Sequence, residues 1–160
     1  MRILFVMDPV GTMLPDRDTT FAFLRSALAR GHQCLHALVR DVYVEGGRLR
    51  VRARETFVSD AAPHAWHGAE HDVEAADLDA ILIRKDPPFD SAYLYLTLLH
   101  EHARGRTLLL NDPRGLRDAN EKLYALQFPE LTPATLVTSA PDRIHAFVRA
   151  HGGRGVIKPL

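Results

Sequence analysis

The sequence lacks the features that mark secreted, membrane-bound or nucleic-acid-binding proteins. It contains a single cysteine, Cys34, so no disulfide can form within the chain. Its 20 basic and 20 acidic residues cancel, which argues against the cationic excess of a nucleic-acid binder or a polybasic membrane module. The apolar run at residues 3–7 is too short for a signal core or a membrane span. We therefore expect a cytoplasmic protein without nucleic-acid or membrane partners.

The glycine-rich motifs of common nucleotide-binding folds are also missing. The segment 8–18, which follows the first apolar run, holds one glycine, Gly11, and does not match Gly-x-Gly-x-x-Gly. Neither a Walker-type phosphate loop nor a Gly-x-Ser-x-Gly elbow occurs anywhere in the chain. These absences argue against a dinucleotide-type site, a P-loop and an α/β hydrolase.

What is present predicts an α/β fold with a mainly parallel sheet flanked by helices. The 160 residues are 46% hydrophobic and 25% charged, as in an ordinary globular domain. Short apolar runs alternate with amphipathic segments, which is the pattern of parallel strands joined by helices. The Gly46-Gly47 pair between two alternating runs predicts a small hairpin. Residues 55–77 are polar and cannot be assigned, and the order of elements restarts near residue 120, which suggests a domain boundary. Predicted strands cover residues 2–7, 33–39, 78–84, 107–110 and 155–158, and predicted helices cover 19–31, 91–103, 116–126 and 141–150.

Three predicted strands are followed by an Asp-Pro sequence, at residues 7–9, 85–88 and 111–113. The carboxyl ends of parallel strands share one edge of a sheet, and ligands bind there in open α/β folds. Each aspartate could equally cap backbone N–H groups beside a proline turn. In the middle segment, Arg84 and Lys85 precede a double proline. A rigid loop that carries a guanidinium suits recognition of a carboxylate, and the alternative is a solvated basic pair.

Other polar residues allow both a functional and a structural interpretation. His64, His67 and His71 have helical spacing and could ligate a metal, but Pro63 and Gly68 favour a solvated polar segment instead. Cys34 lies in an apolar strand, where a packed thiol is the default.

Two lysines stand in unusual surroundings. Lys122 borders the apolar stripe of a predicted helix, where it could simply snorkel to water. Lys158 sits in an apolar run, where a buried lysine needs an anionic partner unless the strand end leaves it exposed.

Several of these segments, taken in order, resemble the bacterial-type glutathione synthetases, a family of ATP-grasp ligases. The similarity runs from end to end and is weakest over residues 41–77. The matching segments are residues 3–9 (ILFVMDP), 84–90 (RKDPPFD), 116–124 (LRDANEKLY), 128–129, 131–133, 135–138 and 157–160 (IKPL).

The resemblance implies a Rossmann-like, pre-ATP-grasp substrate-binding domain over residues 1–120 and the start of an ATP-grasp domain over 121–160. It implies glutathione biosynthesis, in which γ-glutamylcysteine and glycine are joined through an acyl phosphate with ATP and Mg²⁺. Arg84 falls on a family position that contacts the peptide substrate. Lys122 and Lys158 fall on two lysines that hold the nucleotide. No residue of this chain falls on a magnesium ligand, and the resemblance assigns none to a catalytic role.

The family continues after Lys-Pro-Leu into a glycine-rich loop and the remaining nucleotide fold. We therefore expect these 160 residues to be a partial form of the ATP-grasp fold and inactive alone. Two other functions stay open: a stand-alone α/β module that binds a peptide or an amino acid, and another ATP-grasp carboxylate–amine ligase. A homo-oligomer is compatible with the sequence.

Overall fold

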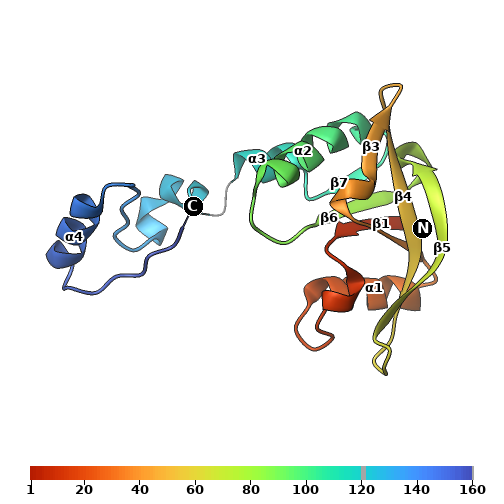
Figure 1. Cartoon of the computed structure of the whole chain (residues 1–160), viewed down its shortest axis with the longest axis horizontal. Helices are drawn as coiled ribbons and strands as arrows, with labels where there is room; N and C mark the ends of the chain where they lie inside the picture. The colour runs from red at the N-terminus through yellow and green to blue at the C-terminus, as the bar shows by residue number, and fades with distance from the viewer. Residues whose placement is uncertain (120–121, 160) are drawn as a thin grey trace. The chain divides into compact units, whose positions relative to one another are not determined.

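The computed structural model describes residues 1–119 and 122–159, which form two compact units, Met1–Arg117 and Asp118–Leu160. The larger unit is an α/β domain built on one sheet, with α1 on one face and α2 on the other (Figure 1). None of the helices in the described part of the chain is long and apolar enough to cross a membrane. The strands are β1 (Arg2–Met7), β2 (Gln33–Ala37), β3 (Val42–Glu45), β4 (Arg48–Val58), β5 (Ala65–Glu74), β6 (Ala80–Arg84) and β7 (Leu108–Leu110), and the helices are α1 (Thr19–Ala29), α2 (Ser91–His100), α3 (Pro113–Asp118) and α4 (Pro141–Ala150).

The sheet has the order β3-β4-β2-β1-β6-β7, with β5 paired to β4 outside that path. The α/β class is confirmed, although "mainly parallel" is not exact for this mixed sheet. The pairs β1–β2, β1–β6 and β6–β7 are parallel, whereas β2–β4, β3–β4 and β4–β5 are antiparallel. The difference comes from residues 55–77, most of which belong to the long β4–β5 hairpin. Most side chains of β5 are exposed or half-buried, so the apolar alternation that signals a strand is absent from its sequence.

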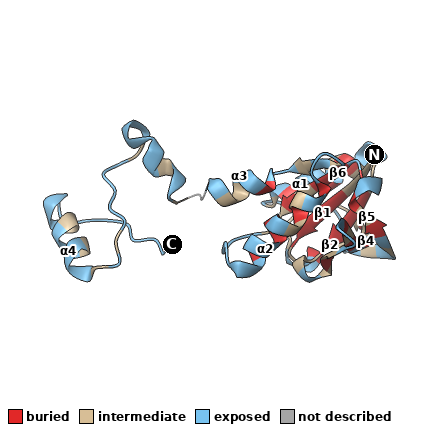
Figure 2. Ribbon diagram, turned by 90° about the horizontal axis from the view of Figure 1, so that it is seen from above, coloured by how far each residue is buried: buried red, intermediate tan, exposed pale blue. Residues whose placement is uncertain are grey.

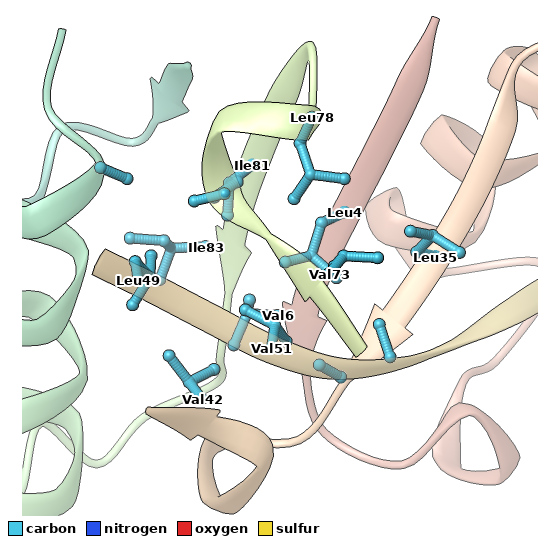
Figure 3. Packing of buried hydrophobic residues seen from close by; sticks show 14 of the residues in the cluster. Leu4, Val6, Leu35, Val42, Leu49, Val51, Val73, Leu78, Ile81 and Ile83 are labelled. Atoms are coloured by element: carbon cyan, nitrogen blue, oxygen red, sulfur yellow. The ribbon is translucent and has the colours of Figure 1, made fainter. Parts of the chain in front are cut away.

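Apolar residues of the central strands build the core on both faces of the sheet. Figure 3 shows the larger cluster, in which Val6, Ile83 and Val51 come from three different strands and pack together. Leu96 of α2 closes this cluster. On the opposite face Phe5, Met7 and Cys34 pack against Leu24 of α1, and the buried residues concentrate in this unit (Figure 2). Burying an apolar side chain of this size contributes about 1.5–3 kcal/mol to the stability of the fold. This packing holds in place the strands whose carboxyl ends form the candidate site.

The residues that cap the helices and form the hairpin turn agree in part with the sequence prediction. Asp90 caps α2 by accepting a hydrogen bond from the Tyr93 N–H at 2.9 Å, as the sequence predicts. The sequence offers Thr19 and Thr20 as possible caps at the start of α1, but the cap is Asp18, whose carboxylate accepts a hydrogen bond from the Thr20 N–H at 2.7 Å. The hairpin at Gly46-Gly47 is confirmed, with φ of 57° and 77° at the two glycines. Only glycine adopts such angles without strain.

The smaller unit differs most from the sequence prediction. The helix expected over 116–126 is wrong: α3 ends at Asp118, residues 120–121 lie outside the described residues, and Tyr124–Gln127 is a 3₁₀ turn. Residues 155–158 are irregular and not a strand. Helix α4 is confirmed, and its half-buried side chains are Ile144, Phe147 and Val148, which recur at helical spacing in the sequence. Within this unit, many apolar side chains are exposed, for example Val156 at 85%.

Candidate substrate-binding edge

The candidate site lies at the carboxyl ends of β1 and β6, where the chain changes direction across the sheet. From β1 the chain crosses through α1 to β2 on one side, and from β6 it crosses through α2 to β7 on the other (Figure 1). Open α/β sheets bind ligands in the crevice at such a switch point. The last residues of the two strands, Met7 and Arg84, are paired in register. The predicted alignment of the three strand ends along one edge is therefore confirmed for β1, β6 and β7.

Arg84 is held by two contacts with α1. Its Nε donates a hydrogen bond to the Thr20 Oγ1 at 3.1 Å, and its guanidinium carbon lies 5.7 Å from the centre of the Phe23 ring. The threonine is buried, while the Phe23 side chain is 43% exposed and forms an open platform. Among the residues that the structure describes, none accepts a hydrogen bond from the two terminal nitrogens of Arg84. A guanidinium fixed through Nε presents these two nitrogens as a fork that matches a carboxylate.

Lys85 and Asp8 fix the loop that follows Arg84. The Lys85 Nζ lies 3.2 Å from the Asp8 Oδ2 and donates to the Asp86 carbonyl at 2.6 Å. The same Asp8 oxygen accepts the Asp86 N–H at 3.2 Å. Asp8 therefore ties the end of β1 to the loop after β6. Of the two cations that the sequence singled out, Lys85 is engaged with the protein itself, whereas the terminal nitrogens of Arg84 have no acceptor among the described residues.

Asp112, which follows β7, has a structural role. Asp112 accepts hydrogen bonds from the backbone N–H groups of Arg114 and Gly115 at the start of α3, at 2.9 and 3.0 Å. It also pairs with Arg104 at 2.7 Å, and these bonds hold the pKa of Asp112 well below its ordinary value. Asp90 caps α2. For Asp112 the capping interpretation is the one that the structure bears out.

The two lysines lie in the smaller unit. The Lys122 Nζ donates a hydrogen bond to the Pro159 carbonyl at 2.5 Å, so Lys122 lies beside the segment that carries Lys158. Lys122 lies in a turn, and Lys158 is exposed in an irregular segment. The burial that made Lys158 unusual in the sequence is therefore absent. The nucleotide-holding role of these lysines stays a prediction.

The three histidines do not form the helical face that their spacing suggested. His67 and His71 belong to β5, and the His64 Nδ1 bonds to the Ser59 carbonyl at 3.2 Å before that strand begins. Within residues 1–119 and 122–159, no group of three or more His, Cys, Asp or Glu side chains is placed to hold a metal ion. The residues described thus do not fit a magnesium site. Cys34 is buried, and burial raises the pKa of its thiol to about 11, as expected of a packed thiol.

Sequence reasoning missed Thr20 and Phe23 as partners of Arg84. Phe23 lies off the inward stripe of Phe21, Leu24 and Leu28, and an aromatic residue on the outer face of a helix was a signal that could have been followed. Thr20 gave no such signal, because its contact with Arg84 joins residues far apart in the sequence.

Comparison with known proteins assigns the family. A model of the prokaryotic glutathione synthetase N-terminal domain matches residues 1–117, and a model of the ATP-grasp domain of the same family matches residues 121–160. The chain belongs to the prokaryotic glutathione synthetase family. It is 42% identical to the glutathione synthetase of Yersinia pestis, 40% to that of Salmonella typhimurium and 37% to that of Vibrio vulnificus, and each match covers the whole chain. The chain spans about half the length of these relatives, 50–51%.

Proposed function

We propose that the chain serves in glutathione biosynthesis, as the peptide-binding part of an ATP-dependent ligase that joins γ-glutamylcysteine to glycine in the cytoplasm. The observation that carries this proposal is the open fork of Arg84 at the switch point of a sheet that belongs to the glutathione synthetase family. γ-Glutamylcysteine carries two carboxylates, and a preorganised guanidinium is the side chain best suited to hold one of them.

Each proposed role follows from the position of the residue. Arg84 binds a carboxylate of the peptide, while Thr20 and Phe23 restrict its guanidinium and so reduce the conformational entropy that is lost on binding. Lys122 and Lys158 bind phosphate oxygens of ATP, which supplies the phosphoryl group that activates the peptide carboxylate. Magnesium would accompany ATP, and the residues described here supply no group for it. We propose that residues 1–120 form the substrate-binding domain and that 121–160 begin the ATP-grasp domain.

Steady-state kinetics of the protein at the full length of its relatives test the role of Arg84. Arg84→Ala is expected to raise the KM for γ-glutamylcysteine at least tenfold and to change the KM for ATP less than twofold. Arg106→Ala is the matched control, because Arg106 precedes β7 and so lies toward the opposite edge of the sheet. An Arg84 variant that loses ATP use and keeps peptide use would contradict the assignment.

The isolated chain offers a second test. We expect the 160 residues alone to bind γ-glutamylcysteine weakly and to show no turnover with γ-glutamylcysteine, glycine and ATP. Robust turnover by this chain would contradict that expectation.

A further inference from the structure

A polar cavity lies on the same edge of the sheet, two strands away from Arg84. It has a volume of about 380 Å³ and lies between β4, β5 and the turn Val39–Asp41 that follows β2. His36, which is only 5% exposed, forms part of its wall. The proposed peptide site does not use these residues. Small-molecule sites are concave and use a small number of placed polar groups to fix the ligand, and this cavity is lined mainly by such groups.

The cavity and Arg84 face the same side of the sheet. His36 is paired with Phe5 of β1, and Arg84 is paired with Met7 of the same strand. Alternate residues of a strand share a face, so His36 and Arg84 lie on the face that α1 covers in part. The His36 Nε2 also bonds to the Met7 carbonyl at 3.4 Å. Two strand spacings, about 10 Å, separate β2 from β6.

Stacked imidazoles form one wall of the cavity. The rings of His36 and His67 lie 5.1 Å apart with an interplanar angle of 9°. The Thr56 hydroxyl donates to the Arg54 carbonyl at 3.1 Å, so it accepts from the His67 Nδ1 at 3.2 Å. The Met7 carbonyl accepts a hydrogen bond from the His36 Nε2–H. Each neutral ring that donates through one nitrogen keeps the lone pair of the other nitrogen as an acceptor.

Arginines and carboxylates line the rest of the cavity in unequal numbers. Arg54 is firmly paired with Glu70 at 2.9 Å. Arg52 lies 3.6 Å from Asp41, beyond hydrogen-bond distance. The side chain of Arg40 has no ion-pair or hydrogen-bond partner within the described part of the chain. The cavity therefore offers two guanidinium groups to an anion, and carboxylate and imidazole acceptors to a cation beside it.

A plain ladder of solvated ion pairs is the structural alternative. That pattern is present further along β4, where Arg48 meets Glu74 at 3.3 Å and Arg50 meets Asp72 at 3.1 Å. At the cavity the ladder continues through Arg54 and Glu70. The contact of Arg52 is long there, and Arg40, which lies outside β4, has no partner among the described residues. Arg48 thus provides a matched control that is chemically similar and lies outside the cavity lining.

We propose that this cavity binds the head group of an α-amino acid, with Arg40 and Arg52 holding its carboxylate and with Asp41, Glu70 and the two imidazoles accepting hydrogen bonds from its ammonium group. The amino-acid class stands on the cavity alone. That the occupant is the γ-glutamyl end of the peptide rests on the proposed function, since one extended peptide would then reach both the cavity and Arg84.

Nuclear magnetic resonance titration of the 160-residue chain with L-glutamate tests the proposal. L-Glutamate should shift the ring signals of His36 and His67 and the backbone amides of residues 37–41. The variant Arg40→Gln with Arg52→Gln should raise the Kd at least tenfold, and Arg48→Gln should change it less than twofold. Unchanged tryptophan fluorescence in each variant establishes that the fold is kept.

Two further probes separate the occupants. Glutarate has the carboxylates of glutamate without the ammonium group, and inorganic phosphate has only negative charge. Binding of either as tight as that of L-glutamate would overturn the amino-acid assignment, as would equal loss on Arg48→Gln. The Arg84→Ala kinetics fail or succeed independently of this titration, because Arg84 does not line the cavity.

Discussion

Glu101 joins the end of α2 to α3, and its substitution gives a prediction with a defined magnitude. Its carboxylate accepts hydrogen bonds from the Arg104 Nε and from an Arg117 terminal nitrogen, both at 2.6 Å. Arg104 continues the network to Asp112, the residue that caps α3. The network therefore joins the turn after α2 to the start and the end of α3, beside the outer strand β7.

The pKa of Glu101 sets an upper limit on the stabilisation. The hydrogen bond from Arg104, followed by that from Arg117, lowers this pKa from 4.5 to about 2. A shift of that size corresponds to about 3 kcal/mol between folded and unfolded chains. The Glu101 side chain is 29% exposed and that of Arg104 is 47% exposed, so screening by water reduces the contribution, and we expect about 1–1.5 kcal/mol.

Urea unfolding of Glu101→Gln measures this contribution. Trp66 is the single tryptophan and lies in β5, so its fluorescence reports unfolding of the larger unit. At pH 7 the variant should unfold with a free energy about 1–1.5 kcal/mol lower than the parent. A carboxyl group with a lowered pKa stabilises the fold above its unfolded pKa, so the difference should shrink as the pH falls below 4.5 toward 2.

A pH-independent difference, or one below about 0.3 kcal/mol at pH 7, would refute this reasoning, because the network would then contribute no more than a solvated surface ion pair. Glu130→Gln is the control. Glu130 lies in the smaller unit and forms no ion pair with the residues that the structure describes, so its replacement should leave the transition of Trp66 unchanged.

Two other predictions concern the sheet edge and its histidines. Thr20→Val removes the acceptor of the Arg84 Nε and should raise the KM for γ-glutamylcysteine about three- to tenfold in the full-length protein, with Thr20→Ser restoring it; an unchanged KM would show that α1 does not position the guanidinium. Burial lowers the pKa values of His36, His67 and His100, so below pH 6.5 the unfolded chain binds protons that the folded chain does not. Above pH 6.5 these histidines are neutral in both the folded and the unfolded chain, so the free energy of unfolding is at its full value there. Urea titrations should show this free energy falling from pH 6.5 to 5.5, and a rise on acidification would contradict the directions of the pKa shifts.

The parts of the fold that could be predicted are those written into short stretches of sequence. The apolar runs of β1 and β6 are buried on both faces, so composition alone reveals them. The β4–β5 hairpin was missed because β5 packs through its backbone against β4 while most of its side chains meet water. The spacing of apolar residues in α2 predicts an inward stripe of Ala92, Tyr95, Leu96 and Leu99. This is partly wrong, because Tyr93 and His100 are buried and Tyr95 is 64% exposed.

The candidate site also has a part that local sequence predicts and a part that only tertiary packing creates. Arg84 could be singled out because a cation after a buried strand must lie at the end of the sheet. Its contacts with Thr20 and Phe23 depend on how α1 packs over the sheet, and local patterns do not contain that information. The stacking of His36 on His67 likewise arises only when β5 pairs with β4 beside β2.

The most direct test of the central claim follows the arginine side chains of the chain by nitrogen-15 resonance during titration with γ-glutamylcysteine. If the fork of Arg84 takes a carboxylate of the peptide, the Arg84 Nε signal shifts and saturates while that of Arg106 at the far edge stays fixed. A peptide that binds and leaves the Arg84 signal unmoved would contradict the claim.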